Sequence, residues 1–217
     1  MKKLFFITNV LIFVMCSVSF GQKYPSVQLK SIHSPANVKI DGKVNEWSVF
    51  QAYNNKVQIY YTLANDSNNI YLIIKSDNKI ITSKILQGGI KFSIKKNDKK
   101  DVVVTYPAVD TKLVKSVYNL MPKAIRDNGT KRTDDELAQD NFALNASNKE
   151  IVKLFKLIGV AGIDNIQDSE IPIYNSLNIK VSASFDPSGA YICEFSLPLK
   201  YISNNLTDNL NPTLARV

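Results

Sequence analysis

The stretch IKVSASFDPSGAYICEFSL, residues 179–197, decides the fold because it contains two strands and the turn between them. Apolar and polar residues alternate on both sides of the turn, which is the period of a strand with one buried face. Residues 186–189, Asp-Pro-Ser-Gly, supply the turn chemistry. The pattern predicts an antiparallel hairpin in which Cys193 faces inward as a small apolar residue and Glu194 points to the opposite face.

The same alternation occurs in residues 56–63 and 70–75, which a short loop rich in Asn, Asp and Ser connects. These segments predict neighbouring antiparallel strands. Tyr60 and Tyr71 lie opposite the most apolar positions of their strands, so the two rings are candidates for joint exposure. Exposed aromatic rings are suited to stacking on sugars.

A third hairpin is predicted over residues 90–106, with its two-residue turn at Asn97-Asp98. Four lysines cluster at the tip of this hairpin: Lys95, Lys96, Lys99 and Lys100. They are typical of a solvated strand edge that discourages aggregation, and contact with an anionic glycan or surface is the alternative. The three hairpins together predict a mainly β protein, built as an antiparallel β-sandwich.

The period changes in residues 111–170, which we interpret as a short helical insertion rather than a separate domain. Capping-box spacing begins at Thr133 and again at Ser147, and the second box precedes apolar residues at helical spacing. Gly159 is the expected end of that helix. The acidic residues 134–136 suit a helix N-terminus, whose dipole favours negative charge.

The first 21 residues have the pattern of a secretory signal peptide. Lys2 and Lys3 precede an apolar run that ends in small residues near Gly21. Cleavage there leaves residues 22–217 as a single domain and, by removing two lysines, lowers the formal charge from +8 to +6. We therefore expect a secreted, periplasmic or cell-surface protein without stable membrane insertion.

The composition weakens most enzyme classes. The chain is 45% apolar and 21% charged, as in globular domains, and it contains one histidine and two cysteines. The sequence contains no GxSxG, HExxH, P-loop, GxGxxG or CxxC motif. The lysines are spread along the chain rather than collected in one stripe, which argues against nucleic-acid binding. We expect a protein that is not an enzyme and has no cofactor and no metal site.

Four segments, in order, resemble family 9 carbohydrate-binding modules and the wider DOMON-like group. Val38 and Ile40 precede DGKVNEW, residues 41–47, which resembles the opening V-x-I-D-G-x-x-x-E-W signature. The other three segments are NIYL at 69–72, the glycine-led hairpin at 89–106, and the closing segment YICEFSLPL at 191–199. The resemblance covers roughly residues 36–203.

This resemblance implies a secreted β-sandwich of jelly-roll or DOMON-like type that binds a carbohydrate without catalysis. Tyr60, Tyr71 and Trp47 are then the candidate stacking residues, and Glu194 is the candidate acceptor for sugar hydroxyl groups. Trp47 has a second interpretation, as a core anchor beside the Asp-Gly turn. Glu194 also has one, because a covered glutamate needs a structural partner such as a backbone amide.

Two other functions remain open at the level of sequence. The same sandwich can act as a surface or periplasmic protein-interaction domain, which an apolar patch on the helical insertion would favour. A haem-binding DOMON domain needs axial ligands, for which the chain after residue 21 offers only His33 and Met121 as the usual pair.

Overall fold

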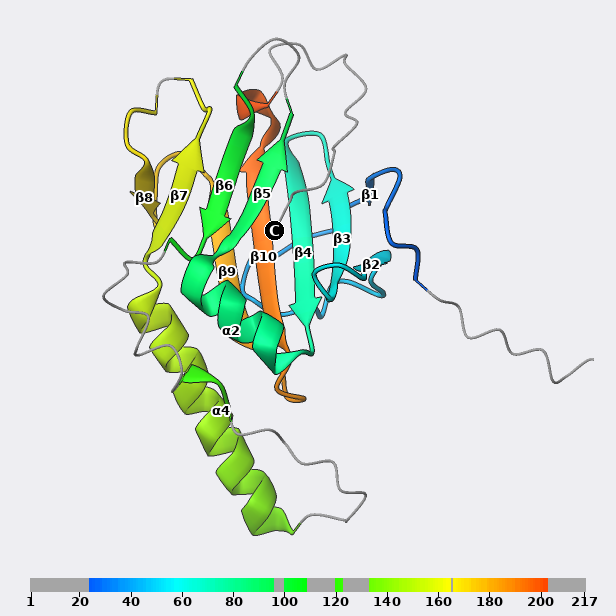
Figure 1. The fold of residues 1–217 in the computed structure, drawn as a ribbon, viewed down its shortest axis with the longest axis vertical. Helices are drawn as coiled ribbons and strands as arrows, with labels where there is room; N and C mark the ends of the chain where they lie inside the picture. The colour runs from blue at the N-terminus through cyan, green and yellow to red at the C-terminus, as the bar shows by residue number, and fades with distance from the viewer. Residues whose placement is uncertain (1–23, 96–99, 109–119, 123–132, 165, 203–217) are drawn as a thin grey trace, which may run out of the picture.

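The computed structural model describes residues 24–95, 100–108, 120–122, 133–164 and 166–202, which form two β-sheets packed face to face (Figure 1). The expected signal peptide, the hairpin turn at Asn97-Asp98 and the C-terminal residues 203–217 lie outside the described residues. The mainly β, antiparallel sandwich predicted from the alternation is confirmed.

The large sheet has six strands in the order β1-β3-β4-β10-β9, with β2 also paired to β3. Its strands are β1 (Ile32–His33), β2 (Ala52–Asn54), β3 (Ile59–Asn65), β4 (Asn69–Ser76), β9 (Lys180–Phe185) and β10 (Tyr191–Pro198). All pairs are antiparallel except β1 with β3. The hairpin of β9 and β10 has the expected turn, in which the Gly189 amide donates to the Asp186 carbonyl over 2.8 Å.

The small sheet has four strands that follow one another in chain order as an antiparallel meander. They are β5 (Ile90–Ile94), β6 (Val102–Tyr106), β7 (Leu157–Ala161) and β8 (Glu170–Pro172). The predicted hairpin over residues 90–106 is confirmed by the register, which pairs Phe92 with Val104.

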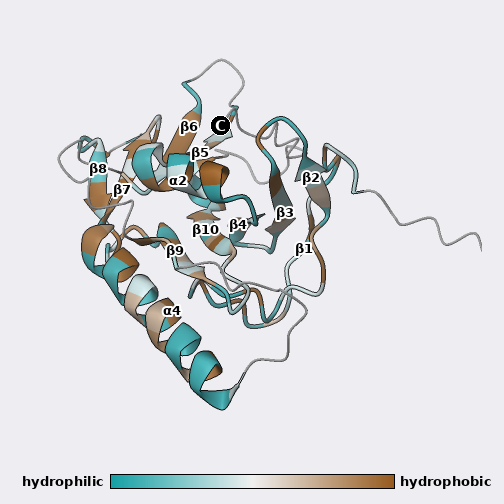
Figure 2. Cartoon of the chain, turned by 60° about the horizontal axis from the view of Figure 1, so that its bottom comes forward, coloured by the Kyte–Doolittle hydropathy of each residue, from teal (hydrophilic) through white to brown (hydrophobic). Residues whose placement is uncertain are grey.

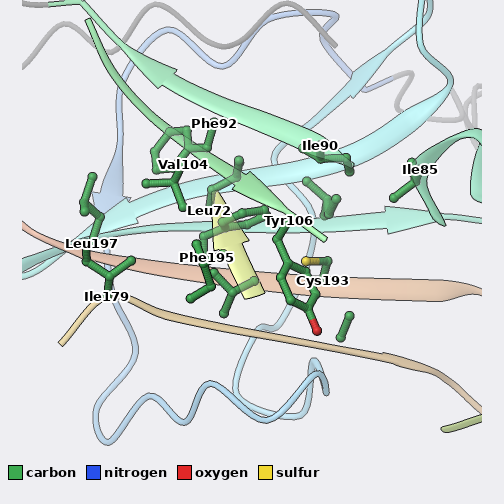
Figure 3. Packing of buried hydrophobic residues seen from close by; sticks show 14 of the residues in the cluster. Leu72, Ile85, Ile90, Phe92, Val104, Tyr106, Ile179, Cys193, Phe195 and Leu197 are labelled. Atoms are coloured by element: carbon green, nitrogen blue, oxygen red, sulfur yellow. The ribbon is translucent and has the colours of Figure 1, made fainter. Parts of the chain in front are cut away.

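The main core lies between the two sheets. Figure 3 shows Phe92, Val104 and Tyr106 of the small sheet facing Leu72, Cys193 and Phe195 of the large one, and all six are buried. Burial raises the pKa of the Cys193 thiol well above its ordinary value. The inward position predicted for Cys193 is confirmed, and its thiol lacks the exposure and lowered pKa of a reactive cysteine.

Two helices flank the sheets. Helix α2 (Lys79–Gly88) was not expected from the sequence; it begins at Asn78, whose side chain caps it, and buries Ile85 and Leu86. Helix α4 (Asp134–Leu154) begins at the predicted capping box, in which Thr133 and Glu136 bond reciprocally.

The predicted helical insertion is correct only in part. A second capping box at Ser147 is wrong, because one continuous helix passes through that residue and buries it. Gly159 does not end the helix, which stops at Leu154; it lies instead in β7. Residues 157–161 and 170–172 therefore complete the small sheet, since their apolar residues are needed to cover the core.

Helix α4 is anchored to the sandwich through Asn148, which lies in its C-terminal half. Asn148 donates to the Phe185 carbonyl and accepts from the Phe185 amide, over 3.0 and 2.7 Å. Figures 1 and 2 both show the N-terminal end of α4 standing away from the sheets. Apolar residues coloured brown in Figure 2 continue along the helix, and Phe142 on it is 78% exposed. No helix within the described ranges is long and apolar enough to cross a membrane.

Candidate functional site

The outer face of the large sheet, opposite the main core, carries the candidate site residues Tyr60, Tyr71 and Glu194, and Trp47 packs on it. The register places Tyr71 beside Ser196 and Ser196 beside Lys180, so these side chains form one row across β4, β10 and β9. The next row contains Ile73 and Glu194. Residues 34–51, here called the N-terminal segment, contain no strand and pack on this face through Val38, Ile40, Val44, Trp47 and Phe50.

Glu194 joins the N-terminal segment to the sheet. Its Oε2 accepts hydrogen bonds from the backbone amides of Asp41 and Gly42, over 3.0 and 2.8 Å. Its Oε1 accepts from the indole Nε1 of Trp47 over 3.0 Å. The glutamate is fully buried, and its two oxygens are satisfied by three donors of the segment. This is the structural arrangement that a covered carboxylate requires.

Burial raises the pKa of Glu194 to about 7, although the hydrogen bonds from Gly42, Trp47 and Asp41 act in the opposite direction. Desolvation disfavours the charged form of any buried carboxyl group, and N–H donors favour it. Because desolvation outweighs the hydrogen bonds, this buried carboxyl group changes its protonation state near neutral pH.

Trp47 of the N-terminal segment and Tyr71 of β4 form an aromatic pair, with ring centroids 6.3 Å apart. Trp47 is 8% exposed and Tyr71 is 7% exposed, so neither offers a free ring face for stacking. The Tyr71 hydroxyl donates to the Asp66 carboxylate over 2.7 Å. Burial and this bond raise the pKa of Tyr71 to about 12.

Asp66 organises the turn between β3 and β4. One of its carboxylate oxygens accepts from the amides of Asn68 and Asn69, each over 2.7 Å. Partial burial acts to raise the pKa of Asp66, but the bonds from Tyr71, Asn68 and Asn69 outweigh it and lower the pKa. The oxygen-rich loop at 66–69 is therefore a turn with satisfied donors, as its sequence suggested.

An open groove with a volume of about 1380 Å³ is lined in part by the row of Tyr71, Ser196 and Lys180. It is lined by the strand ends of β4, β9 and β10, by helix η3 (Leu199–Tyr201) and by the N-terminal segment. The lining residues of its apolar floor are Val38, Ile40, Tyr71, Pro198 and Leu199. The polar lining residues are Lys39, Ser67, Asn68, Asn69, Asn178, Lys180, Ser196 and Lys200.

The rim of the groove presents unused polar groups. Asn68 and Asn178 are exposed, and their side-chain amides make no hydrogen bond to another described residue. The backbone carbonyl of Asn68 accepts from the Leu199 amide over 2.8 Å, which fixes the turn against η3. An apolar floor with a few fixed polar groups is the usual chemistry of a small-molecule or glycan pocket.

The structure brings Trp47, Tyr71 and Glu194 together but places Tyr60 further along the same face of the sheet. Tyr60 pairs with Lys75 and Tyr71 with Ala64, so the two tyrosines stand four residues apart along the strands, roughly 13 Å. Tyr60 is half-buried among Tyr24, Phe50 and Tyr53. The two rings are therefore not exposed together, because the N-terminal segment covers Tyr71.

Sequence reasoning missed the polar residues of the groove. The sequence pattern favours a turn at Asn68 and Asn69, and it does not single out Asn178, Lys180 or Lys200. Asn178 adopts a left-handed backbone conformation with φ of 60° ahead of β9, a conformation that asparagine tolerates better than most residues. Nothing in the sequence pattern indicates that this position lines the same groove as Lys39, because loop packing brings the two residues there.

The described residues were also compared with the requirements of metal and haem sites. Within the described part of the chain, no group of three or more His, Cys, Asp or Glu residues is placed to hold a metal ion. His33 lies exposed on β1, and Met121 packs against the main core. Comparison of the chain with protein-family models, with curated protein sequences and with solved structures gave no match.

Proposed function

We propose that this protein is a secreted, non-catalytic carbohydrate-binding domain that holds a glycan in the groove beside Tyr71. The observation that carries the proposal is the combination of an apolar floor with a rim of unpaired amides, Asn68 and Asn178. Sugars present both CH faces and hydroxyl groups. The floor suits the former, and amide groups that donate and accept suit the latter.

The candidate residues take different roles in this proposal. Tyr71 belongs to the floor of the groove. The bond between Trp47 of the N-terminal segment and Glu194 of the sheet positions Val38 and Ile40 of that segment, which complete the floor. They act through the segment rather than by touching the sugar, whereas Tyr60 packs with Phe50 and Tyr53 outside the groove.

The proposed kinship with family 9 modules and DOMON-like domains has one structural support. The Asp-Gly turn and Trp47 of the opening signature bond directly to Glu194 of the closing segment. Two motifs far apart in the chain thus form one network, which gives their joint presence a physical reason. The signal-peptide pattern of residues 1–21 supports export to the periplasm, the cell surface or the medium.

A glycan array followed by affinity electrophoresis tests the proposed function. The double variant Asn68→Ala/Asn178→Gly should lose retention on any glycan that the unaltered chain binds, at unchanged melting temperature, because glycine tolerates the left-handed backbone of position 178. A matched control is Asn55→Ala/Asn145→Ala, since both residues are exposed and lie outside the groove. Absence of retention on every glycan by a folded, monodisperse sample would refute the proposal.

A protein-interaction domain is the second candidate, and helix α4 favours it. Leu137, Phe142 and Val152 on this helix are large apolar residues that are all exposed. Exposed apolar surface of this kind marks contact sites when it is contiguous. If cross-linking captures a partner, Phe142→Ser should abolish the product, whereas the neighbouring variant Asn141→Ser should keep it.

A further inference from the structure

We infer that the groove takes an acidic polysaccharide, whose sugar units carry carboxylate or sulfate groups; this rests on the proposed function. The lining contains Lys39, Lys180 and Lys200 and no acidic residue. The three lysines come from the N-terminal segment, from the start of β9 and from η3, and all are exposed. Only the fold brings them to one groove.

No carboxylate of the described chain pairs with these three lysines. The ion pairs formed by described lysines involve Lys75 with Asp77 and Asp186, and Lys153 with Glu150. The amine of Lys200 lies 4.9 Å from the ring centroid of Tyr201, a contact that leaves its charge uncompensated. Three cations without counter-charges favour an anionic occupant.

Asp66 is the acidic residue of the adjoining turn, and it does not reverse this balance. Its carboxylate is bonded by the Tyr71 hydroxyl and by the amides of Asn68 and Asn69. It does not line the groove. Even if its charge is counted, the three lysines outnumber it, so the net charge of these four residues is positive.

The size and floor of the groove favour a polysaccharide over other anions. A volume of about 1380 Å³ exceeds the roughly 300–1,000 Å³ of a typical small-molecule pocket, so a chain of several sugar units fits better than one small ion. Single-stranded nucleic acids bind by stacking bases on exposed rings. The ring in this groove, Tyr71, is buried, and the rest of the floor is aliphatic.

The test compares two forms of one sugar chain. Binding of oligogalacturonate and of its fully methyl-esterified form is measured by calorimetry at low and at high salt. We expect the acidic form to bind at least tenfold more tightly, and its affinity to fall with added salt because exposed charges are screened. A sulfated dextran in a third arm shows whether sulfate replaces carboxylate.

A triple variant, Lys39→Gln/Lys180→Gln/Lys200→Gln, assigns the effect to the groove. Each exposed pair contributes about twofold to fivefold in affinity, so the triple variant should lose about tenfold or more. The matched control is Lys84→Gln/Lys91→Gln/Lys149→Gln, which removes the same charge from exposed positions on α2, β5 and α4, outside the groove. The control should bind as tightly as the unaltered chain.

Each other outcome overturns the inference in a distinct way. Equal affinity for the acidic and esterified chains would refute an acidic ligand and leave the proposed function standing. Binding to no glycan at all would refute both. Equal losses in the two triple variants, or equally tight binding of duplex DNA, would show general attraction to a basic protein in place of recognition by the groove.

Discussion

The indole nitrogen of Trp47 donates a 3.0 Å hydrogen bond to Glu194, a residue 147 positions further along the chain. With the amides of Asp41 and Gly42, it holds the N-terminal segment on the outer face of the large sheet. The segment in turn supplies Val38, Lys39 and Ile40 to the groove. The stability of this contact and the shape of the groove are therefore linked.

Replacing Glu194 with alanine should destabilise the fold by roughly 2–4 kcal/mol, because buried N–H donors lose their acceptor. Urea denaturation measures this free energy of unfolding. Ser182→Ala, in the same row of the sheet on β9, is the control and should change stability little. An equal effect of the two substitutions would mean that Glu194 does not hold the segment.

Stability should also depend on pH through Glu194. Its pKa is raised from 4.5 to about 7 in the folded protein, so the folded state binds a proton more readily than the unfolded state between these values. The free energy of unfolding should then decrease as pH rises from about 4.5 to about 7 and level off above it. Glu194→Gln should flatten this dependence in denaturation curves recorded across the range.

Asp66 contributes to the pH dependence of stability with the opposite sign, and it does so in a lower pH range. Its pKa is lowered from 3.8, so its contribution is present above that pH and is lost as pH falls through the lower folded value. Denaturation of Asp66→Asn should therefore differ in shape from that of the unaltered chain only in strong acid. A change between pH 5 and 7 would contradict this assignment.

Trp47→Ala should cost about 3–5 kcal/mol, the usual loss for a buried large aromatic residue. Tyr174→Ala is the comparison, because Tyr174 is 86% exposed and its loss should change stability by less than about 0.5 kcal/mol. Trp47 is the sole tryptophan of the sequence, so its fluorescence reports directly on release of the segment. Loss of glycan binding at unchanged stability would instead make Trp47 a contact residue.

The alternation of apolar residues was sufficient to predict β3, β4, β5, β6, β9 and β10, because each has one face on the main core. It failed where periods overlap. Ile151, Leu154, Phe155 and Ile158 have helical spacing, yet the helix ends at Leu154 and Ile158 begins the core contact of β7. Helix α2 was not predicted because its β-branched residues are typical of a strand. Asn78, which caps the helix, is the one residue that indicates a helix N-terminus there.

The candidate site could be predicted only in part for a different reason. Alternation placed Glu194 and Tyr71 on one face but could not show that the N-terminal segment covers that face. The contact between Asp41 and Glu194 spans 153 positions, and no local propensity encodes it. The lysines of the groove lie at strand ends and loops, where the period carries no information.

Gly42→Ala should release the N-terminal segment without touching any polar group. Gly42 has φ of +81°, and an added Cβ would lie 2.8 Å from the Ala183 carbonyl carbon and 2.9 Å from the Ser184 amide nitrogen. These are backbone atoms of β9 and cannot yield as a side chain would, so the turn must shift and its bond to Glu194 must lengthen. Gly88→Ala is the matched control, since nothing lies within 4 Å of its added Cβ. The control should keep or slightly raise the melting temperature, whereas Gly42→Ala should lower it and expose residues 34–51 to limited proteolysis. Equal behaviour of the two variants would show that the position of the segment does not depend on the close approach of Gly42 to β9.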